Sequence, residues 1–145
     1  MKLVFALLLA LGAASVNSEC RAPDASFASF LKRFKNDRAF QLQRVADPLP
    51  IRSTEPNAKG SMETTIRQIP LRELRTWSHS LIRGNAEVAE LSDSEGKVCE
   101  PKPAVNGNRA EVSQSSCETD IYSDRFVFER FEGCWRLMEK HTSGT

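Results

Sequence analysis

Residues 125–140 read RFVFERFEGCWRLMEK, and the way this stretch pairs with itself decides most of the predicted fold. Glu132 and Gly133 suit a two-residue turn between two antiparallel strands. With that turn, apolar and charged side chains separate onto opposite faces of the hairpin, and a shift of one residue would mix them. The predicted cross-strand pairs are Phe131 with Cys134, Arg130 with Trp135, Glu129 with Arg136, Phe128 with Leu137, and Val127 with Met138.

The two faces of this hairpin differ in character. One face carries Phe126, Phe128 and Leu137, and we expect it to meet the helices of the core. The same face places Arg130 beside Trp135 at cation–π distance. The opposite face mixes apolar and polar groups: Val127, Met138, Cys134 and an ion pair between Glu129 and Arg136.

Residues 25–36 predict an amphipathic helix. Asp24 or Ser26 can cap its start. Phenylalanines on one stripe can line a ligand, but such a stripe is far more often core, and we assign this one to the core. The apolar residues recur at i, i+3, i+4 and i+7, namely Phe27, Phe30, Leu31 and Phe34.

The segment up to Gly84 predicts a hairpin and a second helix. Residues 50–55 and 61–69 are rich in Ile and Thr and flank the turn sequence PNAKG. Residues 71–82 have helical spacing behind Pro70 and ahead of Gly84. The apolar pattern of residues 38–50 is too short to distinguish a helix from a strand before its prolines end it.

Beyond Gly84 the helical period disappears and short strand patterns follow. Asn106 and Gly107 mark a tight turn, while Pro101 and Pro103 confine the preceding piece to an edge or a loop. The last residues, 141–145, are expected to fray. Helices first and strands last indicate an α+β fold. The predicted strands are residues 86–91, 109–115, 124–131 and 134–140.

The first 18 residues have the pattern of a secretory signal peptide: a basic Lys2, an apolar run over 3–11 and then small residues. We expect cleavage after Ser18, which leaves residues 19–145 as a single α+β domain. The apolar run is too short to span a membrane and no other segment is apolar enough, so no span is expected. A lipid anchor on Cys20 is disfavoured because polar residues precede it.

The charges are almost balanced. The chain has 20 Lys plus Arg against 19 Asp plus Glu, and cleavage removes Lys2. A neutral domain is not expected to bind nucleic acid. No N-glycosylation sequence occurs in residues 19–145. Together with the signal peptide, this fits a secreted or bacterial periplasmic protein.

Four cysteines behind a signal peptide favour two disulfides over free or metal-bound thiols. Of the three possible connectivities we favour Cys99 with Cys117, which would clamp the flanks of the Asn106–Gly107 hairpin, and Cys20 with Cys134. The widely spaced cysteines and two distant histidines form no local zinc cluster. Cys134 is therefore expected to be a structural cystine rather than a nucleophile.

The order of these pieces resembles a known family. FASFLKRF (27–34), NDRAFQLQRVADPLP (36–50), a hairpin and FVFERFEGCWRL (126–137) look like an uncharacterised domain-of-unknown-function family of secreted bacterial proteins with a nuclear transport factor 2-like, cystatin-like fold. The most specific parts are FQLQR followed by PLP, and FERxxGxW. The resemblance implies a roll in which N-terminal helices pack on a curved antiparallel sheet that often encloses a pocket. It supplies no catalytic, cofactor-binding or metal-binding residues.

Three functions are compatible with these observations. Because hydrolase, nucleotide-binding and metalloprotease motifs are absent from the sequence, we favour a non-catalytic module that binds a small ligand or an envelope protein. The first alternative is a small-molecule isomerase or hydrolase that uses a pocket carboxylate or Tyr122 with His79 as acid and base. The second is a structural homodimer formed through the mixed sheet face. The candidate pocket residues are His79, Tyr122, Arg130 and Trp135.

Overall fold

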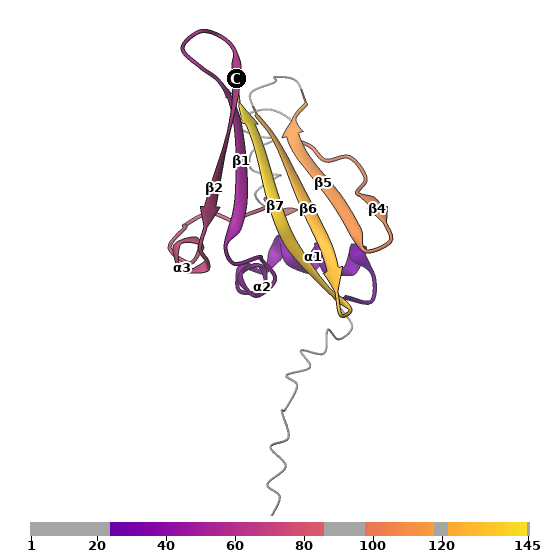
Figure 1. Ribbon diagram of the computed structural model, residues 1–145. Helices are drawn as coiled ribbons and strands as arrows, with labels where there is room; N and C mark the ends of the chain where they lie inside the picture. Colours follow the sequence, from indigo (N-terminus) through magenta and orange to yellow (C-terminus); the bar gives the residue numbers. More distant parts are fainter. Residues whose placement is uncertain (1–23, 86–97, 118–121, 145) are drawn as a thin grey trace, which may run out of the picture.

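The structure is a computed structural model that describes residues 24–85, 98–117 and 122–144. Figure 1 shows helices at one end of a sheet whose strands fan out above them. The helices are α1 (Phe27–Asn36), α2 (Arg38–Gln43) and α3 (Leu71–Leu74). The strands are β1 (Leu49–Pro56), β2 (Met62–Ile69), β3 (Val98–Cys99), β4 (Ala104–Asn106), β5 (Arg109–Ser116), β6 (Tyr122–Phe131) and β7 (Cys134–Gly144).

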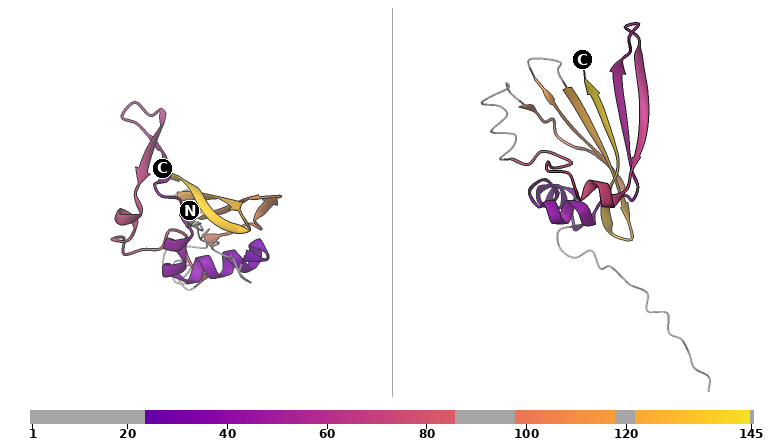
Figure 2. Two further views of the ribbon diagram at one scale, coloured as in Figure 1. Left: turned by 60° about the horizontal axis from the view of Figure 1, so that its bottom comes forward. Right: turned by 90° about the vertical axis from the view of Figure 1, so that its left-hand side faces the viewer.

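One seven-stranded sheet runs in the order β2-β1-β7-β6-β5-β3, and β4 also pairs with β5. The helices cover one face of this sheet near its narrow end, and the two further views show that the sheet is curved around them (Figure 2). This arrangement confirms an α+β class with a curved sheet and few helices. In the described part of the chain, no helix is long and apolar enough to cross a membrane.

The first predicted helix is present as α1. Ser26 is its N-cap, and the Ser26 hydroxyl accepts a hydrogen bond from the Ser29 backbone N–H at 3.2 Å. Asp24, the alternative cap, is instead buried beside Arg44. The predicted apolar stripe is buried in full: Phe27, Phe30, Leu31 and Phe34. The unassigned segment after Asn36 forms α2 and, through a cis Asp47–Pro48 peptide, leads into β1.

The hairpin of β6 and β7 has the predicted register from Phe131 opposite Cys134 to Phe128 opposite Leu137. The next predicted pair is wrong. A bulge shifts the register, so that Val127 lies opposite Glu139 instead of Met138. The extra residue in β7 leaves Phe126 and Phe128 on the core face and also turns Lys140 toward it. Glu129 pairs with Arg109 of β5 at 3.2 Å, although Arg136 lies directly opposite it.

Two further predictions, about the direction of strand pairing and about the C-terminal segment, are wrong. The sheet is mixed rather than antiparallel throughout, because β1 pairs with β7 in parallel. The C-terminal segment does not fray within the described residues, since β7 continues to Gly144. Ser143 lies between Thr54 of β1 and Ser123 of β6, so the end of β7 is hydrogen-bonded into the sheet on both sides.

The second predicted helix is also wrong in length. Residues 71–82 were expected to form about three turns, but α3 ends at Leu74. The backbone beyond it is held by side chains of other elements, because Leu81 N–H donates to the amide oxygen of Gln41 at 3.1 Å. Arg83 likewise exchanges two backbone hydrogen bonds with the side chain of Gln114. These tertiary hydrogen bonds replace the helical ones.

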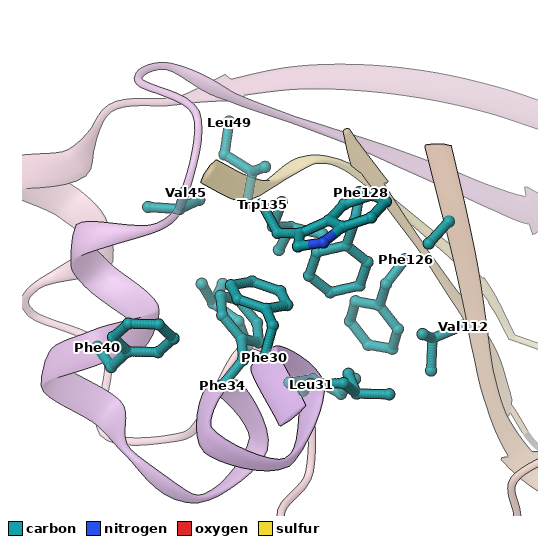
Figure 3. Close-up of a cluster of buried hydrophobic side chains, with 14 of the residues drawn as sticks. Phe30, Leu31, Phe34, Phe40, Val45, Leu49, Val112, Phe126, Phe128 and Trp135 are labelled. Atoms are coloured by element: carbon teal, nitrogen blue, oxygen red, sulfur yellow. The ribbon is translucent and has the colours of Figure 1, made fainter. Parts of the chain in front are cut away.

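The core lies between α1, α2 and the near face of the sheet, and aromatic rings dominate it (Figure 3). Phe128 lies at its centre, with its ring edge-on to Phe27, Phe30 and Phe34 at centroid distances of 5.4, 5.7 and 5.3 Å. Edge-on pairs add about 0.5–1.5 kcal/mol each beyond simple burial. The two predicted motifs, the helix stripe and the aromatic hairpin face, are therefore the two halves of one core.

Several predictions concern residues outside the described ranges. They are the signal peptide at residues 1–18, Cys20, the strand at residues 86–91 and the side chain of Tyr122.

Cys99 and Cys117 form the expected disulfide, with Cα atoms 5.1 Å apart. Cys134 is disulfide-bonded as well, so none of these three cysteines is a free thiol.

Candidate functional site

A pocket of about 190 Å³ opens on the core-side face of the sheet, where Ile51 and Trp77 pack against the hydrophobic core. Three strands and the segment after α3 form its wall. Its lining residues are Ile51, Ser53, Arg67, Ile69, Trp77, His79, Lys140 and Thr142.

Strand register explains why these residues meet. Side chains two apart on a strand point to the same face. In β1, Ile51 and Ser53 are such a pair, and the parallel register places them beside Lys140 and Thr142 of β7. The antiparallel register on the other side places Arg67 of β2 opposite Ile51. The pocket therefore depends on the parallel β1–β7 pairing.

Trp77 and His79 form an aromatic wall of the pocket. Their rings are stacked, with centroids 5.0 Å apart and an interplanar angle of 23°. They lie in the irregular segment that replaces the predicted second helix. In a helix, residues i and i+2 would point in different directions, so the end of α3 at Leu74 is what allows the two rings to face each other.

The charged lining residues are cations. Lys140 is mostly buried, and its Nζ lies 3.3 Å from the Asp124 carboxylate and 3.4 Å from the Leu81 carbonyl. The guanidinium of Arg67 is well exposed and only loosely paired with Glu73, at 3.4 Å. No carboxylate is among the lining residues. The pocket therefore combines an apolar wall, two hydroxyls and positive charge.

The structure does not bring the four predicted pocket residues together. His79 lines the pocket. Trp135 is buried in the aromatic core, 4.9 Å from the Phe27 ring. Arg130 donates to the backbone carbonyl of Asp24 at 3.2 Å. Tyr122 begins β6 opposite Gly144, and its side chain lies outside the described residues.

Arg130 belongs to a buried charge cluster rather than to the pocket. Asp24 is 1% exposed, and its carboxylate lies 3.0 Å from Arg44. Burial raises the pKa of the Asp24 carboxyl above its ordinary value, against the opposing positive charges of Arg44, Arg130 and Arg33. This cluster fixes the start of α1 to the closing hairpin, which is a structural role.

Sequence reasoning missed Arg67, Lys140 and Trp77 as pocket residues. The alternation of METTIRQI places Arg67 on the same face as the buried Ile69, which is a weak signal. Nothing in the sequence near Lys140 indicated that it lines the pocket. Its position depends on the bulge in β7 and on the parallel pairing with β1, and a local sequence pattern reveals neither. The described residues hold no group of three or more His, Cys, Asp or Glu side chains suited to a metal ion.

Solved structures share this architecture. No family model and no curated protein matches the chain. An NTF2-like protein from Bacteroides fragilis aligns with a TM-score of 0.53 and 18% identity over 82% of this chain. The fold is nuclear transport factor 2-like. The alignment covers 47% of the Bacteroides protein, so this chain spans less than half of its length.

Other similar structures include nuclear transport factor 2-like proteins of unknown function, DUF4783 family proteins and a de novo designed protein with a curved β-sheet. One from Shewanella baltica has a TM-score of 0.41 and 15% identity, with 74% of this chain and 77% of that chain covered. A DUF4783 family protein from Bacteroides uniformis has a TM-score of 0.41 and 10% identity, with 80% and 94% covered. The fold implied by the sequence motifs agrees with that of the Bacteroides fragilis protein.

Proposed function

We propose that this chain is a secreted, non-catalytic binding module that holds a small anionic molecule in the pocket of β1, β2 and β7. The observation that carries the proposal is the composition of the pocket lining. Arg67 supplies an exposed positive charge, Lys140 a second cation that Asp124 pairs at 3.3 Å, Ser53 and Thr142 supply hydroxyls, and no carboxylate lines the pocket. A carboxylate or phosphate group would complement this set.

The shape of the pocket supports a compact ligand with an apolar part. Ligand sites for drug-sized molecules are commonly about 300–1,000 Å³, and this pocket is smaller, at about 190 Å³. The stacked rings of Trp77 and His79 offer a flat apolar surface, and Ile51 and Ile69 continue it. A small aromatic or aliphatic carboxylate would place its apolar part against this wall and its charge near Arg67.

Secretion is part of the proposal. The first 18 residues have the composition of a signal peptide, and the Cys99–Cys117 disulfide is typical of an oxidising compartment. Binding rather than catalysis is favoured because the described lining residues give His79 no carboxylate partner with which to transfer a proton.

Benzoate is a suitable probe, with benzamide as a neutral control of the same shape and benzylamine as a cationic one. Binding is measured by NMR from the indole N–H resonance of Trp77, with the buried Trp135 as an internal reference. We expect benzoate to shift the Trp77 resonance at lower concentration than either control. Equal responses to all three probes, or none to any, would overturn an anion site.

A pair of arginine variants tests the source of the selectivity. Arg67→Met removes a charge from the lining, whereas Arg72→Met removes an exposed charge on α3 that does not line the pocket. We expect benzoate to bind several-fold more weakly to Arg67→Met and equally well to Arg72→Met. If both variants weakened binding alike, the effect would come from net charge and the assignment of the site would be wrong.

A further inference from the structure

The outer edge of β2 is open, whereas the opposite edge of the sheet is protected. Within the described residues β2 is the last strand on its side (Figure 1), and its residues 62–68 are all exposed. The opposite edge consists of β3 and β4, which are two and three residues long and are separated by Pro101 and Pro103. Short strands and prolines prevent further pairing, but β2 has eight residues and no proline.

The hydrogen-bond pattern of the β1–β2 hairpin determines which backbone groups point outward. Asn57 N–H donates to the Ser61 carbonyl at 2.8 Å, so this pair is hydrogen-bonded. Hydrogen-bonded and non-hydrogen-bonded pairs alternate along an antiparallel ladder. The backbone groups of Glu63, Thr65 and Arg67 therefore bond to β1, and those of the even-numbered residues between them face away from it.

The charges on β2 complement each other across a two-fold axis. If two copies of β2 pair antiparallel about Thr65, Glu63 of each copy lies opposite Arg67 of the other. The outward N–H and C=O groups of the even-numbered residues then lie opposite one another, with Thr64 of one copy facing Ile66 of the other. Hydrogen bonds across an antiparallel pair of strands need this arrangement. Glu63 and Arg67 meet in non-hydrogen-bonded pairs, where side chains are closest. In registers centred on Thr64 or Ile66, neither Glu63 nor Arg67 lies opposite a residue of the other charge.

We propose that two copies of this chain associate through the outer edges of β2, antiparallel about Thr65, to join two seven-stranded sheets into one. Such an isologous two-fold contact closes on itself and leaves no new edge. On the far face of β2 from the pocket, Ile66, which is 50% exposed, would lie opposite Thr64 of the second copy. The two ion pairs fix the register, and the two contacts of Ile66 with Thr64 beside the axis bury apolar surface.

The sheet face expected from the sequence to form a dimer is less suited to this role. The charge of Glu129 on that face is already paired within one chain, since Arg109 binds both Glu111 and Glu129 at 3.2 Å. Val127 in the middle of that face is 2% exposed. In contrast, Glu63 makes no ion pair with the described residues, and Arg67 has only the exposed contact to Glu73.

The dimer is expected to be weak and reversible because a single pair of strands buries less than a standard interface. Sedimentation velocity over a wide concentration range, on the disulfide-bonded chain without added ligand, measures it. We expect concentration-dependent dimerisation of the original chain. A monomer at every concentration would overturn the proposal.

Charge exchange tests the register directly. Glu63→Arg and Arg67→Glu each place two like-charged pairs at the interface, and each should weaken self-association roughly tenfold or more. Mixing the two variants restores both opposite-charge pairs, so a heterodimer should form where neither variant dimerises alone. Misfolding cannot produce this result. If dimerisation is unchanged in the single variants, the contact lies elsewhere, for example on the sheet face.

A proline substitution separates this contact from the pocket, because Arg67 takes part in both. Thr64→Pro removes an outward N–H and leaves the backbone hydrogen bonds between β1 and β2 in place. It also removes the hydroxyl contact of Thr64 with Thr54 of β1 at 2.9 Å, and Thr64 does not line the pocket. Thr64→Ala is the matched control, since it loses the same hydroxyl contact to Thr54 but keeps the outward N–H. We expect Thr64→Pro to abolish dimerisation and to bind benzoate as before, while Thr64→Ala still dimerises. Dimerisation of Thr64→Pro at the original strength would overturn edge pairing.

Discussion

Gln41 and Gln114 hold the same stretch of backbone from two different elements. Gln41 on α2 accepts a hydrogen bond from Leu81 N–H at 3.1 Å and donates to the Phe34 carbonyl at 2.7 Å. Gln114 on β5 accepts from Arg83 N–H at 3.1 Å and donates to the Arg83 carbonyl at 3.0 Å. Both side chains are buried. These amides replace the helical hydrogen bonds that this segment lacks.

Gln41→Leu is expected to destabilise the protein by about 2–3 kcal/mol, because it leaves the buried Leu81 N–H and Phe34 carbonyl without partners. Gln43→Leu makes the same substitution on the same helix at an exposed position and should change the free energy of unfolding by less than about 0.5 kcal/mol. Urea unfolding of the three proteins measures both effects. Equal effects at the two positions would mean that the buried amide does not stabilise the segment.

The same segment shows why part of the fold could be predicted and part could not. The first helix and the closing hairpin depend on spacings of three, four and two residues, which a sequence displays directly. The helix predicted over residues 71–82 also had the right spacing. It was lost to hydrogen bonds with Gln41 and Gln114, which are 40 and 31 residues away from the backbone groups they bind.

The candidate site was harder to predict than the fold. Its charged residues Arg67 and Lys140 become neighbours only through the parallel pairing of β1 with β7. Parallel pairing joins distant segments and has no turn sequence to mark it. Of the four predicted pocket residues, His79 lines the cavity, and its role there stays a prediction. Trp135 and Arg130, which the hairpin pattern suggested, lie in the core and beside Asp24.

Phe128→Ala is expected to cost about 3–5 kcal/mol, because it opens a cavity where three rings meet the Phe128 ring edge-on. Phe131→Ala, on the same strand, removes a ring that is 49% exposed and should cost less than about 1 kcal/mol. Thermal or urea unfolding compares the two. If Phe128→Ala does not fold, Phe128→Leu gives a smaller loss that still must exceed that of Phe131→Leu.

The Cys99–Cys117 disulfide holds the two-residue strand β3 against β5 and closes a loop with a sequence separation of 18. Replacing both cysteines by alanine should lower the free energy of unfolding by about 3 kcal/mol, chiefly because the unfolded chain gains conformational entropy. The variant is preferable to a reductant because it leaves the Cys134 disulfide intact. An unchanged free energy of unfolding would show that holding β3 against β5 does not stabilise the fold.

The acid dependence of stability should contain a contribution from Glu139. Burial alone would raise the pKa of its carboxyl, but a hydrogen bond from Arg52 and the charges of His141 and Arg52 outweigh burial and lower it. A carboxylate with a lowered folded pKa stabilises the protein above the unfolded pKa, about 4.3. That stabilisation is lost as the pH falls through the lower, folded pKa.

Glu139→Gln should therefore destabilise the protein by about 1 kcal/mol near neutral pH, and the difference from the original chain should shrink to nothing in strong acid. Glu55→Gln is the matched control, because Glu55 is exposed on β1 and makes no ion pair with the described residues. Its curve should run parallel to that of the original chain. Urea unfolding between about pH 2.5 and pH 7 gives all three curves. A Glu139→Gln difference that stayed constant down to the lowest pH would mean that shape rather than charge at Glu139 stabilises β7 against β1.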